Sequence, residues 1–453
     1  MQFVKPSLLQ TSLPQHSNNF ASYRLNVTNF FGHAHELKQR LVKGLRWSLI
    51  GSVLSKILVL IASITCARIL GKHLFGEFSV IRSTIALFVT VGSAGLGVTA
   101  SKFISQKIVE EKESLPNLIE IINVLSVLFA LSVAIIIYNN SELISNYLKS
   151  PDLTEYIKYS SFIIFLLSLC ATQTGILVGF ESFRLIALIN LTTGVFEFTG
   201  LVIGSYLYGI EGAIIGYGIS FIVMYILNAY TIKIILSNYN IEKKPLKSLK
   251  LLKEILNFSI PATLSGLIVT PVFWISKSFV TRCNGFDEIA IYEVSEQWRV
   301  ILLFIPSVIS QVLLPILSSL NQNNRISDRS SEILRINILI NATISSIFCI
   351  VVILMSNIIM KLYGHDFNDT STLIVISIST IFTSISNVVG LAIASINKMW
   401  CGFGFNLGWG LCMTTCAYIF TDLGYGSLGI AFALLISYVV HTVIQIIYLA
   451  HNK

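Results

Sequence analysis

Four basic side chains lie inside long apolar stretches of the sequence, where a charge is energetically costly. They are Lys56, Arg82, Lys277 and Arg299. A charge at the bilayer centre costs about 2.5–3.5 kcal/mol on insertion scales, so each cation needs water or an anionic partner. Arginine and lysine bind phosphate oxygens, so four cations around one hydrated cavity would bind an anionic group such as a diphosphate. Arg82 and Lys277 could instead extend to the membrane surface.

Three acidic residues accompany these cations in the apolar stretches. Glu293, Glu296 and Arg299 are spaced three residues apart, which places them on one helix face. A local bridge between Glu296 and Arg299 is therefore the alternative to a ligand-binding role for this arginine. Glu197 lies deep in its apolar run and could couple to a proton or sodium gradient, or pair with Lys56. We predict the three acids as candidates for ion coupling or gating.

These side chains must be positioned by membrane-spanning helices. Of the 453 residues, 54% are hydrophobic and 12% are charged, about half the charged share of a soluble domain. This composition excludes a water-soluble enzyme, and apolar runs of about 20 residues exclude a transmembrane barrel. The sequence predicts an all-α polytopic membrane protein with about 12 transmembrane helices. The runs lie near 45–68, 76–101, 118–138, 157–180, 185–208, 210–236, 254–279, 291–320, 334–360, 371–395, 400–421 and 428–449.

The basic residues predict how the chain is oriented. Lys and Arg on one side of the predicted membrane outnumber those on the other by about three to one, which places both termini in the cytoplasm. The polar segment 1–43 contains no apolar core of a signal peptide and is predicted to be a flexible cytoplasmic tail. A basic cytoplasmic linker at 237–253 separates two predicted lobes, 44–236 and 254–453. The net charge of +8 therefore reflects topology rather than binding of nucleic acid.

Two short matches indicate that the chain is an internal duplication. NLTTG at 190–194 corresponds to NLGWG at 406–410, and YGIEG at 208–212 corresponds to YGSLG at 425–429, at nearly the same offset. Two six-helix repeats would begin on the same side of the membrane and form two pseudo-symmetric bundles around a central cavity, an arrangement known among secondary transporters. The first, second, seventh and eighth helices, which carry the four cations, would then face one another.

The chain lacks the common motifs of catalysis and metal binding. It contains neither a phosphate-binding G-x-x-x-x-G-K-[ST] loop nor an H-E-x-x-H zinc motif. The seven cysteines mostly occupy apolar runs without histidines or acids at ligand spacing. We therefore expect no catalytic residue, no metal site and no cofactor.

Several blocks of sequence resemble bacterial polysaccharide exporters and O-antigen flippases, which belong to the multidrug/oligosaccharidyl-lipid/polysaccharide superfamily. The resemblance extends from about residue 38 to the end, and the tail departs from it. The most specific block is ARILGKHLFGE at 67–77. The others are KGLRW at 43–47, GLG at 95–97, KFIS at 102–105, FSIP at 258–261, DEIAIY at 287–292 and LPILS at 314–318.

The resemblance implies a function, a location and partners. Members of this family translocate an undecaprenyl-pyrophosphate-linked oligosaccharide from the cytoplasmic to the periplasmic leaflet of the bacterial inner membrane. The implied mechanism is alternating access, in which the two lobes rock about the central cavity. The implied partners are the lipid-linked glycan, the bilayer, and the polymerase and chain-length proteins of O-antigen and lipopolysaccharide biosynthesis.

Two other functions are weighed against this interpretation. Multidrug efflux antiporters of the same superfamily typically have acidic cavities, whereas the first helix here carries Lys56 and no acid. A membrane glycan polymerase or glycosyltransferase generally carries its catalytic groups on a large extracytoplasmic loop. The longest predicted outer loop, 138–156, is too short for this role. We therefore predict that the protein is not an enzyme.

Overall fold

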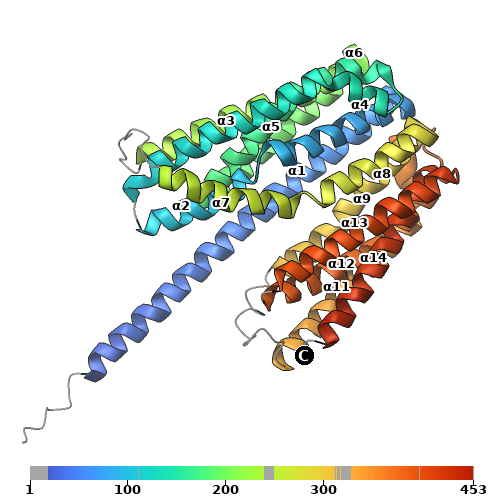
Figure 1. Cartoon of the computed structure of the whole chain (residues 1–453). Coiled ribbons are helices and arrows are strands. Elements are labelled where there is room, and N and C mark those ends of the chain that lie inside the picture. Colours follow the sequence, from blue (N-terminus) through green and yellow to red (C-terminus); the bar gives the residue numbers. More distant parts are fainter. Residues whose placement is uncertain are drawn as a thin grey trace, which may run out of the picture.

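The computed structural model describes residues 19–110, 112–238, 249–311, 313, 317, 328–396 and 398–451, and no strand occurs among them (Figure 1). The long helices are α1 (Asn19–Gly92), α2 (Leu96–Glu110), α3 (Leu115–Asn139), α5 (Thr154–Gly179), α6 (Phe183–Asn238), α7 (Leu249–Gly266), α8 (Val269–Asn284), α9 (Phe286–Gln311), α11 (Asp328–Tyr363), α12 (Ser371–Ser395), α13 (Met399–Asp422) and α14 (Gly426–His451). Helix α4 (Ser141–Tyr147) and the 3-10 turns Lys112–Ser114 and Pro151–Leu153 are short. The predicted all-helical fold is confirmed.

Seven helical stretches among the described residues are long and apolar enough to cross a membrane. They are Val53–Gly92, Leu115–Asn139, Pro151–Gly179, Phe183–Ser237, Arg329–Tyr363, Ser371–Ser395 and Gly426–His451. Two of them, of 40 and 55 residues, contain non-helical residues near their middle, and each therefore comprises two helical arms. The protein is a multi-pass membrane protein, and the number of twelve spans and the cytoplasmic placement of both termini stay predictions.

Glycines form the turns of four helical hairpins. Gly71 divides α1 with φ 76° and ψ 171°, and Gly285 separates α8 from α9 with φ 90° and ψ 179°. Only glycine occupies this region of φ and ψ without strain. Gly209, within α6, and Gly426, at the start of α14, also have positive φ, of 60° and 54°. Because the paired glycines fall at corresponding places in the two halves, they support the predicted duplication.

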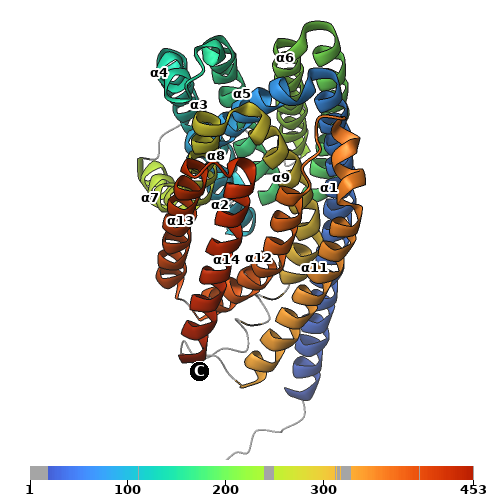
Figure 2. The same ribbon diagram turned by 90° about the vertical axis from the view of Figure 1, so that its right-hand side faces the viewer.

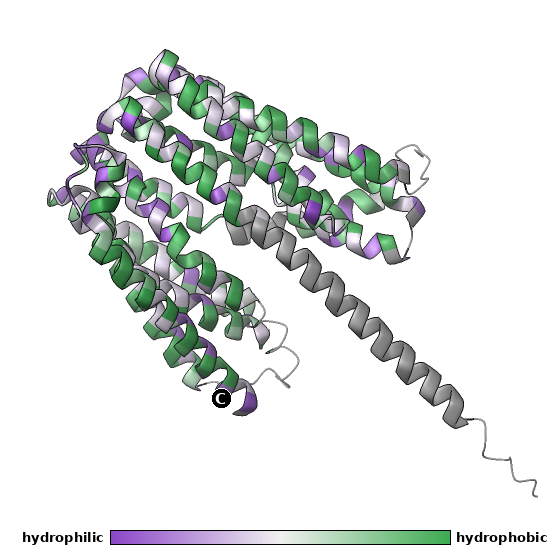
Figure 3. Cartoon of the chain, turned by 180° about the vertical axis from the view of Figure 1, so that it is seen from behind, coloured by the Kyte–Doolittle hydropathy of each residue, from purple (hydrophilic) through white to green (hydrophobic). Residues whose placement is uncertain are grey.

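The α6 hairpin is closed by glycines that its two arms bring together. A Cβ atom added to Gly212 would overlap the carbonyl oxygen of Gly204, and one added to Gly216 would overlap that of Gly200. Residues without side chains allow membrane helices to approach this closely. Many large apolar residues are exposed in this structure, among them Leu354, which is 79% exposed. Figure 3 shows that hydrophobic residues are frequent along the helices of both bundles. Such a surface is suited to contact with lipid.

The first lobe (α1–α6) and the second lobe (α8–α14) meet at one end of the molecule and diverge toward the other (Figures 1 and 2). At the meeting point, Arg68 Nε of α1 donates a hydrogen bond of 2.5 Å to the Leu362 carbonyl oxygen of α11. His73 Nδ1 lies 3.1 Å from Asp287 Oδ1 of α9. Gly76 is packed against the Phe286 carbonyl group. We call this set of contacts between lobes the closed end.

Helix α7 does not pack with the lobe to which its place in the sequence assigned it. It lies against α1, α2 and α3 of the first lobe. The centroid of the Phe258 ring lies 6.0 Å from that of Phe103. Lys102 Nζ lies 3.8 Å from the centroid of Phe258. Ser259 Oγ donates a hydrogen bond to the Ala94 carbonyl oxygen. The predicted lobe boundary at residues 253/254 therefore does not coincide with the packing, and the chain changes lobes between α7 and α8.

The predicted terminal tail and linker are covered only in part. Residues 19–43 of the predicted tail (1–43) belong to α1, so this part is helical rather than irregular. A helix grows readily from an existing one, because each added residue contributes a hydrogen bond. Residues 1–18, residues 239–248 of the linker and most of the block 314–318 lie outside the described residues.

Candidate functional site

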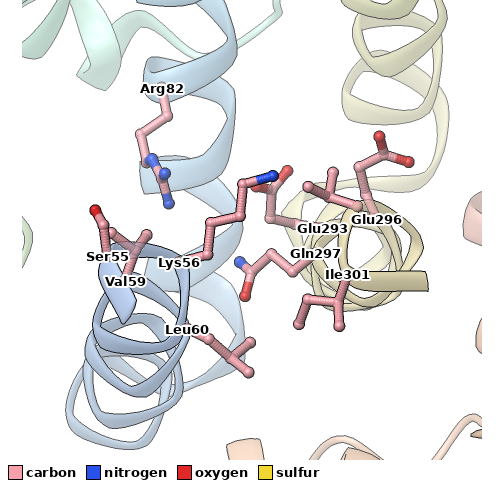
Figure 4. A pocket seen from close by; sticks show the side chains of 10 residues that line it. Ser55, Lys56, Val59, Leu60, Arg82, Glu293, Glu296, Gln297 and Ile301 are labelled. Atoms are coloured by element: carbon pink, nitrogen blue, oxygen red, sulfur yellow. The ribbon is translucent and has the colours of Figure 1, made fainter. Parts of the chain in front are cut away.

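Two adjoining cavities lie between the lobes, each about 280 Å³ in volume. The first, which we call the cation chamber, is lined by both arms of α1 and by α9, and includes Lys56, Arg82 and Gln297 (Figure 4). The second, which we call the aromatic chamber, extends to α6 and α8 and includes Tyr217 and Trp274. Arg82, Glu293 and Glu296 line both chambers.

The hairpin of α1 brings Lys56 and Arg82 into one chamber. These residues are 26 positions apart, which in a straight helix would separate them by about 39 Å. The turn at Gly71 folds the second arm back, so both side chains line the same cavity. The position of this turn therefore determines the composition of the site.

Lys56 reaches the chamber without an ionic partner. Its Nζ atom lies 4.7 Å from the centroid of the Phe304 ring of α9. No carboxylate of a described residue lies within 4.0 Å of it. Figure 4 shows its side chain directed toward the α9 residues of the chamber. The ammonium group is therefore available to a ligand.

Arg82 is held by aromatic rings rather than by an ion pair. Its guanidinium carbon lies 5.3 Å from the centroid of Tyr217 and 5.8 Å from that of Phe78. Glu197 and Glu293 act on it electrostatically, but neither forms a pair within 4.0 Å in the described structure. Tyr217 also interacts with the guanidinium group through its hydroxyl. Arginine commonly stacks on aromatic faces in this way, and its five N–H donors exceed what one hydroxyl can accept.

Lys277 joins the two chambers through a salt bridge. Its Nζ atom donates to Glu293 Oε2 at 2.8 Å, and both side chains are largely buried. The bridge connects α8 to α9, and both residues line the aromatic chamber. Lys277 therefore does not extend to the membrane surface.

Arg299 is set apart from the other three cations. Its Nε and Nη2 atoms donate to the two carboxylate oxygens of Glu296 at 2.7 and 2.6 Å. Its guanidinium carbon lies 5.4 Å from the centroid of Phe273, and it lines neither chamber. The structure brings together Lys56, Arg82 and Lys277, whereas Arg299 forms the local bridge that its spacing allowed.

Glu197 is buried in α6, with 7% of its surface exposed. Arg82 is the charged group that acts on it, rather than Lys56. No ion pair within 4.0 Å holds its carboxylate among the described residues. The expected pairing with Lys56 is absent from this part of the chain, and a role in ion coupling stays a prediction.

Several residues of the site were not anticipated from the sequence. Gln297 Nε2 donates to Ser63 Oγ at 2.7 Å, and its Oε1 accepts from Tyr363 OH at 3.1 Å, which joins α1, α9 and α11. Gln297 follows Glu293 by four residues, so the shared helix face could have indicated it. Tyr217 and Trp274 gave no such signal, because aromatic residues in apolar helices usually pack in the core.

A third cavity, of about 470 Å³, lies between α1, α9 and α11, and we call it the apolar pocket. Its walls are almost entirely hydrophobic, with Phe304 and Phe348 among them. It shares Lys56, Leu60 and Ile301 with the cation chamber. The ammonium group of Lys56 therefore marks the junction between an apolar and a polar compartment.

Comparison with known proteins gives the family. The profile of a family described as "Polysaccharide biosynthesis protein" matches residues 41–321. The EPS I polysaccharide export inner membrane protein EpsE of Ralstonia nicotianae is 23% identical over 183 residues, which are 40% of this chain and 42% of the relative. The same protein from Ralstonia solanacearum is 22% identical over 183 residues. The match spans less than half the length of these curated relatives.

Solved structures share the fold. The inward-facing conformation of a multidrug resistance MATE family transporter of the MOP superfamily has a TM-score of 0.72 and 16% identity, and the match covers 88% of this chain and 95% of that one. The lipid II flippase MurJ, in an inward closed conformation, has a TM-score of 0.73 and 19% identity, with coverages of 89% and 87%.

The names of these proteins describe an exporter, a transporter and a flippase. The resemblance expected from the sequence motifs is confirmed, because the profile covers more than half of the chain. We conclude that this multi-pass membrane protein belongs to the polysaccharide biosynthesis protein family.

Proposed function

We propose that the protein is a flippase that moves an undecaprenyl-pyrophosphate-linked oligosaccharide, such as an O-antigen repeat unit, from the cytoplasmic to the periplasmic leaflet of the bacterial inner membrane. One observation carries the proposal. Lys56 and Arg82, neither of which is held by a carboxylate of the described structure, line one chamber between the lobes. A diphosphate would supply the missing negative charge, with Arg82 binding two oxygens through its fork and Lys56 acting as a point charge.

The apolar pocket supports an amphiphilic substrate. A polyprenyl diphosphate has an apolar chain joined directly to its charged group. The apolar pocket meets the cation chamber at Lys56 in the same way. A tail in the pocket, or in the lipid beside it, would leave the diphosphate next to this ammonium group. A substrate without a long apolar part would have no use for this junction.

The arrangement of the lobes supports alternating access. With the N-terminus in the cytoplasm, the turn at Gly71 and the closed end face the periplasm, and the lobes diverge toward the cytoplasm, where the substrate is made. Breaking the contacts at the closed end would open the chamber to the opposite leaflet. Glu197, beside Arg82, is the acid we propose for coupling to a proton or sodium gradient. A polymerase and a chain-length protein would act on the exported unit.

The test is export of the glycan by Lys56→Ala and Arg82→Ala variants. Loss of one charged hydrogen-bonding group costs about 1.5–3 kcal/mol, so we expect transport to fall roughly 10- to 100-fold while the protein stays in the membrane. Lys361→Ala, which removes an exposed lysine outside the chambers, is the matched control. Surface glycan at the normal level in the double variant would contradict the proposal.

The multidrug antiporter fold makes drug export the second candidate. It is disfavoured by the charge distribution, because Glu293 and Glu296 are neutralised by Lys277 and Arg299. The groups left for a ligand are cations, which would repel the cationic drugs that acidic cavities accept. Unchanged drug susceptibility of cells that produce the protein is the expected result. Resistance to organic cations that requires Glu293 would favour the antiporter.

A further inference from the structure

The aromatic chamber contains groups that a diphosphate does not need. Tyr217 of α6 and Phe273 and Trp274 of α8 supply aromatic surface to its wall. A pyranose ring presents C–H groups on its faces, and these pack on aromatic rings while its hydroxyl groups bind polar side chains at the edge. Apolar and aromatic walls with a few placed polar groups are typical of small-molecule sites.

Trp274 is fixed before any ligand arrives. Its Nε1 atom donates to Thr84 Oγ1 at 2.9 Å, and its ring stacks on Tyr147 at a centroid distance of 6.0 Å and an angle of 16°. Both partners belong to the first lobe, whereas Trp274 belongs to the second. An aromatic surface that is already ordered loses little conformational entropy on binding.

The polar groups of the chamber favour an uncharged ligand. The Lys277 ammonium has three donors and gives one to Glu293, so donors and carboxylate lone pairs remain for hydroxyl groups. The pair as a whole is neutral, and Glu296, which also lines the chamber, is neutralised by Arg299. Arg82 lines this chamber too, and its charge would be neutralised by the diphosphate that the proposed function assigns to it. The Thr270 hydroxyl lines the chamber without a hydrogen bond to any described residue. A sugar carboxylate would lie near two acids here.

The three compartments have a linear order. Lys56 lines both the apolar pocket and the cation chamber, and Arg82 lines both the cation chamber and the aromatic chamber. The apolar pocket and the aromatic chamber share no lining residue. This order matches that of tail, diphosphate and first sugar in a lipid-linked glycan.

We propose that the aromatic chamber is the binding subsite for the sugar joined to the diphosphate, and that it selects an uncharged pyranose. This inference rests on the proposed function and adds the residues that would recognise the sugar. Trp274 supplies the packing surface, and Thr270 and the Lys277–Glu293 pair bind the hydroxyl groups.

The test compares three probes on the purified full chain in lipid nanodiscs. They are undecaprenyl pyrophosphate, the same lipid carrying one N-acetylglucosamine, and the same lipid carrying one glucuronic acid. We expect the N-acetylglucosamine probe to bind about three- to tenfold more tightly than the sugar-free lipid. The affinity of the glucuronic acid probe should exceed that of the sugar-free lipid by a smaller factor. Trp274→Ala should bring the first ratio close to one while leaving the Kd of the sugar-free lipid unchanged.

Matched variants separate sugar packing from folding. Trp274→Phe keeps an aromatic ring but loses the hydrogen bond to Thr84. Most of the preference for the N-acetylglucosamine probe over the sugar-free lipid should therefore remain. Thr270→Val is nearly isosteric and should lower the ratio of the two Kd values a few-fold. If Trp274→Ala does not fold, Thr270→Val is the variant that tests the subsite. Trp400→Ala removes a tryptophan that is 84% exposed on α13 and should change nothing.

The outcomes distinguish this inference from the proposed function. Equal binding of the first two probes by the unmodified protein, or equal weakening of both by Trp274→Ala, would overturn the sugar subsite. Tighter binding of the glucuronic acid probe would overturn the selection for an uncharged ring. The proposed function fails separately if the sugar-free lipid does not bind, or binds equally well after Lys56→Ala and Arg82→Ala.

Discussion

A buried cation can serve a ligand only to the extent that no carboxylate already neutralises it. Arg299 is bound by both oxygens of Glu296, and Lys277 is bound by Glu293. Lys56 and Arg82 face aromatic rings instead. In this division Arg299 and Lys277 hold α9 and its carboxylates in place, whereas Lys56 and Arg82 have no carboxylate partner among the described residues and are the cations that the proposed function gives to the diphosphate.

The role assigned to Arg299 predicts a pattern of stability. Removing one partner of a buried ion pair leaves an uncompensated charge and typically costs about 3–5 kcal/mol. Arg299→Met should therefore lower the thermal unfolding temperature in detergent, and the double change Arg299→Met/Glu296→Met should recover most of the loss. A single variant as stable as the unmodified protein would show that the bridge is not structural.

Residues of the site could be found from the sequence where a charge interrupts an apolar run. Lys56, Arg82 and Lys277 met this condition, and they line the chambers. The local pairing of Arg299 was visible as one of two alternatives, because i and i+3 residues are neighbours on a helix. The proximity of Glu197 to Arg82 depends on how two hairpins pack, which no local spacing encodes. Trp274 looks like any core aromatic residue until its neighbours are known.

At the scale of elements, the glycine turns position the cations. Gly71 and Gly285 adopt nearly the same backbone conformation, and neither has an atom within 4 Å of the place where a Cβ would be added. A substitution there would introduce strain through the backbone alone, without a steric clash. Substitutions at these two positions therefore test whether the hairpin turns require glycine.

Gly71→Ala and Gly285→Ala should each destabilise the protein by about 1–3 kcal/mol, because alanine is strained at these angles. The thermal unfolding temperature and the yield of folded protein are the measurements. Gly402→Ala in α13 is the control, since that position is helical and equally open, and alanine should be tolerated or slightly stabilising. Equal stability of all three variants would mean that the turns do not require glycine.

The apolar runs predicted the helices well, because a bilayer demands long apolar segments with internal hydrogen bonds. The predicted second run, 76–101, is interrupted by a turn in which Ala94 has φ 45° and Gly95 has φ 62°. The residues around this turn, 91–98, are all apolar or small, so hydropathy could not locate the break. The packing of α7 against the first lobe was likewise invisible, because hydropathy does not tell which helices are neighbours.

At the scale of the whole molecule, the contacts at the closed end must break if the lobes alternate. His73→Cys and Asp287→Cys, in a chain whose native cysteines are replaced by serine, would place two thiols across this interface. Cross-linking them with a short bifunctional reagent that a reductant can cleave should arrest glycan export, and reduction should restore it.

The control for cross-linking places both thiols within one helix. Glu155→Cys and Lys158→Cys lie three residues apart on α5, so a link between them should leave export unchanged. Full export with the first pair quantitatively linked would contradict a mechanism that separates the lobes at this end.

Helix α7 follows the basic linker in the sequence yet completes the wall of the preceding bundle. Its side chains contact Ala94, in the turn before α2, and Phe103 of α2. Only Leu267 and Ile268 separate it from α8. The covalent connection between the two lobes is therefore the two residues between α7 and α8. If the lobes rock against each other, these two residues must accommodate the change in angle along the chain. In a protein expressed as two polypeptides divided at the linker, α7 would belong to the second polypeptide but would pack in the first lobe.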